Sequence, residues 1–277
     1  MNKIQNIFFL IFRINRFIIL FVLCFSGVGM VFSQGIKEEK IEKLQKVEAE
    51  KLFLDRFGNL YSVKDATFNK YNAAGELLYT YSNFLLGPIH SADVGNPMKI
   101  MLFYKESAAL LFLDDRLAPI SESFDLYSKN FTSISLAAYS SNNLIWLLDE
   151  ARTNLLSLDI FYNERSNIHH NFKPFAPSQI FEADDKTIAI HNQQQGIYFF
   201  DSFGTYIKTI AIQTLFDVQI INHTIYYIRE NRLHAYNMQT LQEEQFELPI
   251  PEVQQCLRYR NLLYLLNKKG EVFVVSL

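Results

Sequence analysis

Short apolar runs and polar turns alternate along most of the chain. Residues 142–159 show the pattern twice: a polar start, a run of Leu, Ile or Trp residues, and a closing aspartate. The runs are rich in Ile, Val, Tyr, Phe and Thr, whereas Asp, Asn and Gly occupy the turns. Such runs are typical of β-strands and are too short for buried helices. The pattern therefore predicts an all-β protein.

The pattern recurs at a nearly constant interval. One marker is the start of an apolar run, at steps of 37 to 45 residues: Leu60, Ile100, Ile145, Ile188, Ile225 and Leu263. A second marker is the polar residue that closes the next run, at steps of 36 to 45 residues: Asn72, Asp114, Asp159, Asp201, Asn237 and Ser276. Two markers that share one period indicate six repeats.

Each repeat has room for four strands. In the fourth repeat we expect strands over Ser178–Ala183, Thr187–His191, Gly196–Asp201 and Thr205–Ile212. The second and third runs of a repeat are almost continuously apolar, as in Ile100–Tyr104, so both faces of these strands must be covered. Four-stranded antiparallel sheets packed face to face around an axis meet that need. The sequence therefore predicts a six-bladed β-propeller.

The sixth repeat is one strand short. It offers only the runs Val253–Arg258, Leu262–Leu266 and Glu271–Leu277. The charged segment Lys40–Val47 precedes the first repeat, and we predict that it forms the outer strand of the last blade and closes the ring. Charges suit an outer strand because they deter pairing with other chains. An amphipathic interaction helix is the alternative for this segment.

Residues 1–33 are predicted to be an export signal peptide, and residues 34–277 a single propeller domain. Three basic residues precede an apolar run over Phe17–Val28, and Val31 and Ser33 suit cleavage before Gln34. We therefore expect an exported protein, in the periplasm or associated with the outer membrane. We expect no transmembrane span after the signal is cleaved.

Two other readings of the N-terminal segment remain. An uncleaved anchor would place Arg13 and Arg16 inside the bilayer, at a cost of a few kcal/mol each. A lipid anchor on Cys24 would follow Leu23, a position at which lipoprotein signals prefer a small residue.

Charge and cysteine content narrow the possible partners. The formal net charge is −3, and removal of a basic leader makes the remaining chain more acidic. With no block of basic residues, the chain has no electrostatic reason to bind nucleic acid. Cys256 is the one cysteine after Cys24, so no intrachain disulfide forms in the mature chain, and we expect Cys256 to be buried.

Motifs that would indicate catalysis are absent from the sequence, including Gly-x-Ser-x-Gly, His-Glu-x-x-His, Cys-x-x-Cys and a Gly-rich phosphate loop. The pair Asp114-Asp115 falls where a strand ends, and Asp is favoured in such turns. The pair His169-His170 points to opposite faces of a strand, so it does not form one metal site. We predict no catalytic residue, metal or cofactor.

The inner strands, which line the channel of a propeller, carry the candidate binding residues. These are His90, Asp93, Asn96, Gln179, Glu182, Asp217, Gln219 and Gln254. The group from His90 to Asn96 is the densest, but it offers only part of the oxygen ligands that a hard cation needs. The alternative is that these residues only form the polar lining of a wet channel.

Three stretches, Phe57–Tyr61, Gly95–Tyr104 and Gly196–Gly204, resemble an uncharacterised family of exported β-propeller proteins of Gram-negative bacteria, in the style of NHL and WD40-like propellers. The resemblance covers the mature chain and implies the fold but no activity. We expect a non-catalytic propeller that binds an envelope protein or acts as a scaffold, as a monomer or in a hetero-complex. The alternatives are a cation-dependent hydrolase or lactonase with its site in the channel, and a sugar- or peptide-binding module.

Overall fold

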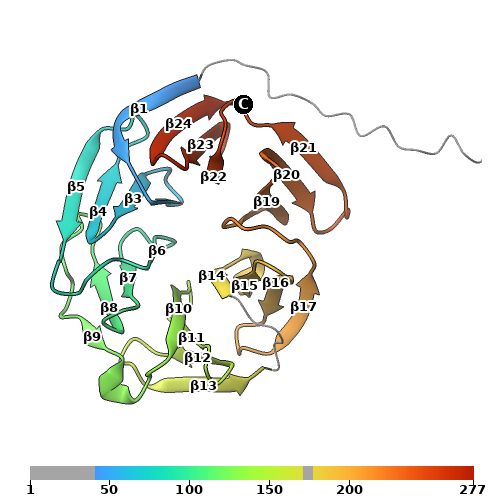
Figure 1. The fold of residues 1–277 in the computed structure, drawn as a ribbon. Helices are drawn as coiled ribbons and strands as arrows, with labels where there is room; N and C mark the ends of the chain where they lie inside the picture. The colour runs from blue at the N-terminus through green and yellow to red at the C-terminus, as the bar shows by residue number, and fades with distance from the viewer. Residues whose placement is uncertain (1–40, 171–176) are drawn as a thin grey trace, which may run out of the picture. The chain divides into compact units, whose positions relative to one another are not determined.

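Strands account for nearly all regular structure in this computed structural model, which describes residues 41–170 and 177–277. Within these residues, 24 strands form six antiparallel sheets of four strands each. The sheets stand as blades around a ring (Figure 1). The six-bladed β-propeller predicted from the repeat is confirmed.

Blades 1 to 5 each use four strands that follow one another in the sequence. Blade 1 holds β2 (Lys51–Leu54), β3 (Leu60–Lys64), β4 (Thr67–Tyr71) and β5 (Leu77–Ser82). Blade 2 holds β6 (Ser91–Asp93), β7 (Ile100–Tyr104), β8 (Ala109–Leu113) and β9 (Phe124–Asp125). Blade 3 holds β10 (Ile134–Tyr139), β11 (Ile145–Asp149), β12 (Asn154–Leu158) and β13 (Glu164–His169). Blade 4 holds β14 (Pro177–Glu182), β15 (Ile188–Asn192), β16 (Gly196–Phe200) and β17 (Tyr206–Ile210). Blade 5 holds β18 (Gln219–Ile221), β19 (Thr224–Arg229), β20 (Arg232–Asn237) and β21 (Glu243–Glu247).

Blade 6 joins the two ends of the propeller domain. It holds β22 (Val253–Tyr259), β23 (Leu262–Asn267) and β24 (Glu271–Ser276), with β1 (Ile41–Glu48) as its outer strand. β1 runs antiparallel to β24, with Ile41 opposite Val275 and Lys43 opposite Phe273. Figure 1 shows β1 beside β24 on the rim. The predicted ring closure is confirmed, and the charged segment is a strand rather than a helix.

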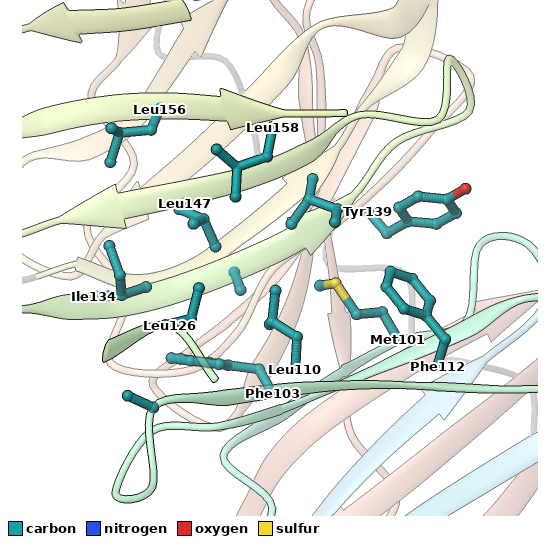
Figure 2. Close-up of a cluster of buried hydrophobic side chains, with 13 residues drawn as sticks. Met101, Phe103, Leu110, Phe112, Leu126, Ile134, Tyr139, Leu147, Leu156 and Leu158 are labelled. Atoms are coloured by element: carbon teal, nitrogen blue, oxygen red, sulfur yellow. The ribbon is translucent and has the colours of Figure 1, made fainter. Parts of the chain in front are cut away.

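The described residues form six hydrophobic clusters, one between each pair of neighbouring blades. Strand β7 shows why its sequence is continuously apolar. Met101 and Phe103 pack into the cluster against blade 3, shown in Figure 2, whereas Ile100, Leu102 and Tyr104 pack into the cluster against blade 1. Alternate side chains point to opposite faces of a strand, and both faces are buried here.

The polar residues that close the third strand of a blade are capping residues of tight turns. Asp159 is typical: its Oδ1 accepts hydrogen bonds from the backbone N–H groups of Phe161 and Asn163, at 2.8 and 2.9 Å. Asn72, Asp114 and Asp201 make the same pair of bonds, and Asn237 makes a close variant. These side-chain turns explain the second marker of the repeat. Ser276, the last residue of β24, is the exception among the described residues, because it makes no such pair of bonds.

The meander defines two faces of the ring. Because successive strands reverse direction, the turns after the first and third strands of blades 1 to 5 and the turn after the first strand of blade 6 lie on the same face, which we call the turn face. The remaining turns and the connections between blades lie on the opposite face, the loop face.

The predicted signal peptide and its cleavage site lie outside the described residues and stay predictions. Within the described residues, no helix has both the length and the apolar character needed to cross a bilayer.

Candidate functional site

The inner strands enclose a cavity of about 360 Å³ in the channel of the ring. Its walls come from blades 1 to 4, with Asp217 from the connection before β18. Six of the eight residues predicted from the sequence line this cavity: His90, Asp93, Asn96, Gln179, Glu182 and Asp217. Most of the residues predicted from the sequence therefore line one cavity, but several of them are hydrogen-bonded to the backbone of neighbouring blades or turns.

Glutamines of the inner strands tie neighbouring blades together. Gln255 accepts a hydrogen bond from the backbone N–H of Leu52 at 2.8 Å and donates one to the Leu52 carbonyl at 2.9 Å, which joins blade 6 to blade 1. Gln219 makes the same two bonds to Arg258, at 2.7 and 3.2 Å, and joins blade 5 to blade 6. In each case a side-chain amide satisfies backbone groups that would otherwise lie unpaired at the edge of an inner strand.

Gln179 plays the same part between blades 4 and 5. Its Oε1 accepts a hydrogen bond from the backbone N–H of Val218 at 3.0 Å. The side-chain oxygen of Gln179, which the sequence suggested as a ligand contact, is therefore already hydrogen-bonded to the backbone.

Two carboxylates make the corresponding bonds between blades 2 and 3 and between blades 3 and 4. Asp93 accepts the backbone N–H of Tyr139 at 3.0 Å and, with its other oxygen, the N–H of Gly95, also at 3.0 Å. Glu182 accepts the backbone N–H of Ser141 at 2.7 Å and the Ser141 hydroxyl at 2.9 Å. We call Asp93, Gln179, Glu182, Gln219 and Gln255 the inter-blade clasps. Burial raises the pKa of Asp93 to about 6, although its two N–H partners favour the ionised form.

Two predicted site residues have other surroundings. Asn96 accepts the backbone N–H of Met98 at 3.1 Å and so caps a turn at the rim of the cavity. Gln254 does not line the channel cavity, and instead lines a separate pocket that includes Glu48, Lys64 and Lys268. The sequence could not separate Gln254 from Gln255, because both are glutamines of one inner strand.

Two further charged groups of the cavity form an ion pair across the channel, and Arg56 lines the cavity as well. Lys51 Nζ of blade 1 lies 3.3 Å from the Oδ2 of Asp217, which precedes blade 5. His90 lines the same cavity, and burial, followed by the charges of Lys51 and Lys105, lowers the pKa of His90 to about 4. His90 is therefore neutral at pH 7 and offers a hydrogen-bonding ring rather than a charge.

A buried histidine that the sequence did not single out lies behind the cavity wall. His191 on β15 is fully buried, and its Nδ1 is 2.9 Å from the hydroxyl of Ser178, which lines the cavity. Its Nε2 has no hydrogen-bond partner within the described residues. Burial lowers the pKa of His191 to about 4, against a smaller opposing effect of Asp217. His191 lies in an apolar second strand, and nothing in that sequence context indicated that its ring would contact a residue of the cavity wall.

Within the described residues, no group of three His, Cys, Asp or Glu side chains is arranged to hold a metal ion. His169 and His170 do not form one either: His169 is exposed at the end of β13, whereas His170 is buried against Phe200. Chemically, the cavity offers the Lys51–Asp217 ion pair, the Arg56 guanidinium, the neutral ring of His90 and hydroxyl groups.

The turn face carries a repeated feature of a different kind. In three turns a capping aspartate is followed two residues later by an exposed phenylalanine, and Phe57, Phe161 and Phe203 have 62%, 74% and 73% of their surface exposed. Met98 and Leu241 are exposed on turns of the same face. The sequence holds a signal for this feature, the triplet Asp-x-Phe at 55–57, 159–161 and 201–203.

Comparison with known proteins identifies the fold. The chain is similar to the virginiamycin B lyase from Staphylococcus aureus, solved with quinupristin, at 10% identity over 86% of this chain and 99% of the lyase, with a TM-score of 0.62. It is similar to the Neurospora crassa Pan2 WD40 domain, at 10% identity over 88% of this chain and 97% of that domain, with a TM-score of 0.59. It is also similar to BBS1N, solved in complex with ARL6DN, at 12% identity over 79% of this chain and 75% of BBS1N, with a TM-score of 0.52.

These similarities support a propeller and no single activity. One of the similar structures is a lyase, and another was solved with a bound protein. No protein-family model matches the chain, and no curated protein matches its sequence. At such low identity only the fold carries over, because unrelated functions share the propeller.

Proposed function

We propose that this protein is an exported, non-catalytic propeller that binds a protein partner of the cell envelope through its turn face. The observation that carries the proposal is the set of exposed phenylalanines at one position of three capped turns, Phe57, Phe161 and Phe203. Large aromatic side chains dominate the energetics of protein interfaces. The caps hold the turns in shape before binding, which lowers the cost of ordering them.

The hydrogen bonds of the channel also support a non-catalytic function. Four of the six predicted residues that line the cavity are engaged with backbone N–H groups: Asp93, Asn96, Gln179 and Glu182. A carboxylate that holds two blades together is a poor candidate for a general acid or base, because proton transfer would weaken the junction.

Cross-linking in intact cells tests the proposal. The variant Phe161→Ser/Phe203→Ser removes two aromatic rings from the turn face, and Leu215→Ser removes an equally exposed residue from the loop face as a matched control. We expect the wild type and Leu215→Ser to capture the same envelope protein. The double variant should lose the cross-link by roughly tenfold or more, since aromatic hot spots contribute about 2 kcal/mol each. Equal capture by all three proteins would contradict the proposal.

A second experiment addresses the alternative of a cation-dependent hydrolase or lactonase. A ligand at 100 times its dissociation constant raises stability by about 2.7 kcal/mol. We expect calcium, magnesium and zinc to leave the melting temperature of the wild type unchanged. An increase in the wild type that disappears in Asp93→Asn would instead support a cation site in the channel.

A further inference from the structure

The outer strand of blade 1 and the connection that follows it form a long exposed apolar edge. Residues 77–89 contain no charged side chain. Within β5, Leu77, Leu78 and Tyr79 are exposed, and Phe84 and Leu85 follow on the connection with 75% and 97% of their surface exposed. Large exposed apolar side chains that gather in one region of a protein favour an interaction site there.

The backbone of this edge is available for pairing. β5 is the last strand of its sheet and is hydrogen-bonded to β4 on one side, and no strand in the described part of the chain pairs with its other side. Two exposed hydroxyls of β5 bond to the neighbouring strand β4: the Thr80 hydroxyl donates to Asn69 at 2.8 Å, and the Ser82 hydroxyl lies 3.0 Å from that of Thr67. The free edge of β5 therefore presents a row of backbone donors and acceptors, and the exposed side chains of Leu77, Leu78 and Tyr79 flank it on the sheet faces.

The other outer strands are protected by charge or by shortness. β1, β13, β17 and β21 each contain at least one Lys, Arg, Asp or Glu, and β9 has only two residues, one of them Asp125. Charged side chains on an edge strand deter pairing with other chains. β5 is the one outer strand among the described residues that lacks this protection, and Figure 1 shows it on the rim of the ring.

We propose that β5 pairs antiparallel with β5 of a second copy of this chain, which joins two blades into one continuous sheet. Antiparallel pairing of identical strands gives a closed two-fold dimer in which each residue contributes twice. The observation that points to a second copy is the absence of charge. Self-pairing of β5 opposes no like charges in any register, whereas self-pairing of β17 about its central residue would oppose Lys208 to Lys208.

The glutamates of β21 show the same contrast. Self-pairing there would bring Glu243, Glu244 and Glu247 of two copies onto one strand pair. For β5, cross-strand neighbours would be leucine, tyrosine and threonine, and such pairs are stabilising. The contact is small compared with a standard interface, so the dimer is reversible and depends on concentration. The proposal does not depend on the turn face or on its partner.

Sedimentation velocity of the purified protein, used as it is recovered from the cells that produce it, tests the proposal. We expect the wild type to shift from monomer to dimer as its concentration rises. Tyr79→Lys introduces a charge on β5 and should keep the protein monomeric over the same range. Ile207→Lys introduces the same charge on the outer strand β17, at similar exposure, and should dimerise like the wild type.

Cysteine cross-linking gives a readout that does not rely on losing an interaction. Under mild oxidation, an equal mixture of Tyr79→Cys and Thr80→Cys chains should form a disulfide-linked dimer, because pairing about the middle of β5 places these two positions opposite each other or opposite themselves. Ile207→Cys should remain monomeric. Cys256 is buried and does not contribute. A wild type that stays monomeric at every concentration would overturn the proposal. So would a dimer that persists in Tyr79→Lys, or a cross-link that forms equally well from β17.

Discussion

At the scale of single residues, burial of titratable groups in and around the channel links the stability of the fold to pH. Burial lowers the pKa values of His90 and His191 to about 4, from an unperturbed value of about 6.5. Burial raises the pKa of Asp93 to about 6. The two effects have opposite signs, and the histidines outnumber the aspartate.

We predict that the free energy of unfolding falls as the pH is lowered from about 6.5 to 4.5. In this pH window His90 and His191 are protonated in the unfolded chain but stay neutral in the folded chain. Acid therefore favours unfolding. Asp93 acts in the reverse sense, because the folded chain takes up its proton first. Urea unfolding at several pH values measures the slope. His191→Gln should flatten it, and Asp93→Asn should steepen it; an unchanged slope in both variants would refute this account.

At the scale of elements, the clasps and the closing strand hold neighbouring blades together. A clasp acts on a single junction, whereas β1 supplies a whole strand and part of a hydrophobic cluster. Both can be tested with variants that leave the rest of the chain unchanged.

The clasp between blades 6 and 1 offers a matched pair of adjacent glutamines. Gln255→Ala removes both hydrogen bonds to Leu52 and leaves a buried N–H and C=O to find new partners, at a cost of about 1–3 kcal/mol. Gln254→Ala, one residue earlier on β22, should change the free energy of unfolding by less than about 0.5 kcal/mol. Denaturant titration of the two variants compares them. Equal effects would mean that the Gln255 bonds do not stabilise the junction.

Deletion of the closing strand should have a larger effect. Leu44 and Val47 of β1 are buried in the cluster between blades 6 and 1, and burial of each such side chain contributes about 1.5–3 kcal/mol. We expect a chain without residues 34–48 to melt at a much lower temperature. A chain that lacks only residues 34–40 keeps β1 and should melt like the full-length protein. Equal melting temperatures for both deletions would contradict a stabilising function of β1.

The sequence predicts the elements well because they depend on local composition and on the repeat. The strands of blade 4 lie within one or two residues of the predicted ends, since Asp, Asn and Gly mark the turns directly. The functions of the polar residues were harder to predict. Gln179 and Val218 bond across 39 positions of sequence, and only the ring geometry brings them together. The pairing of Lys51 with Asp217 joins blades that are not neighbours, so no repeat pattern could reveal it.

At the scale of the whole molecule, the ring is closed by a strand that begins at Ile41, only seven positions after Gln34, the predicted start of the mature chain. The export that we propose would therefore leave the closing strand in the chain. The chain that emerges after cleavage would keep β1 and so retain every strand of blade 6. A cut further along the chain, within β1, would remove part of that strand. We therefore expect the position of the proposed cleavage to affect the stability of the domain.

We predict that the exported protein begins at Gln34. A small residue is needed immediately before the cut, so Ser33→Tyr should block processing, whereas Gln34→Asn, on the other side of the cut, should leave it intact. N-terminal sequencing and intact mass of the protein from the envelope fraction distinguish the products. A first residue of Cys24 carrying lipid would establish the lipid-anchor alternative, and an unprocessed Met1 would establish either an uncleaved anchor or no export. Among these three outcomes, a start at Gln34 is the one that removes the apolar segment Phe17–Val28 and keeps β1.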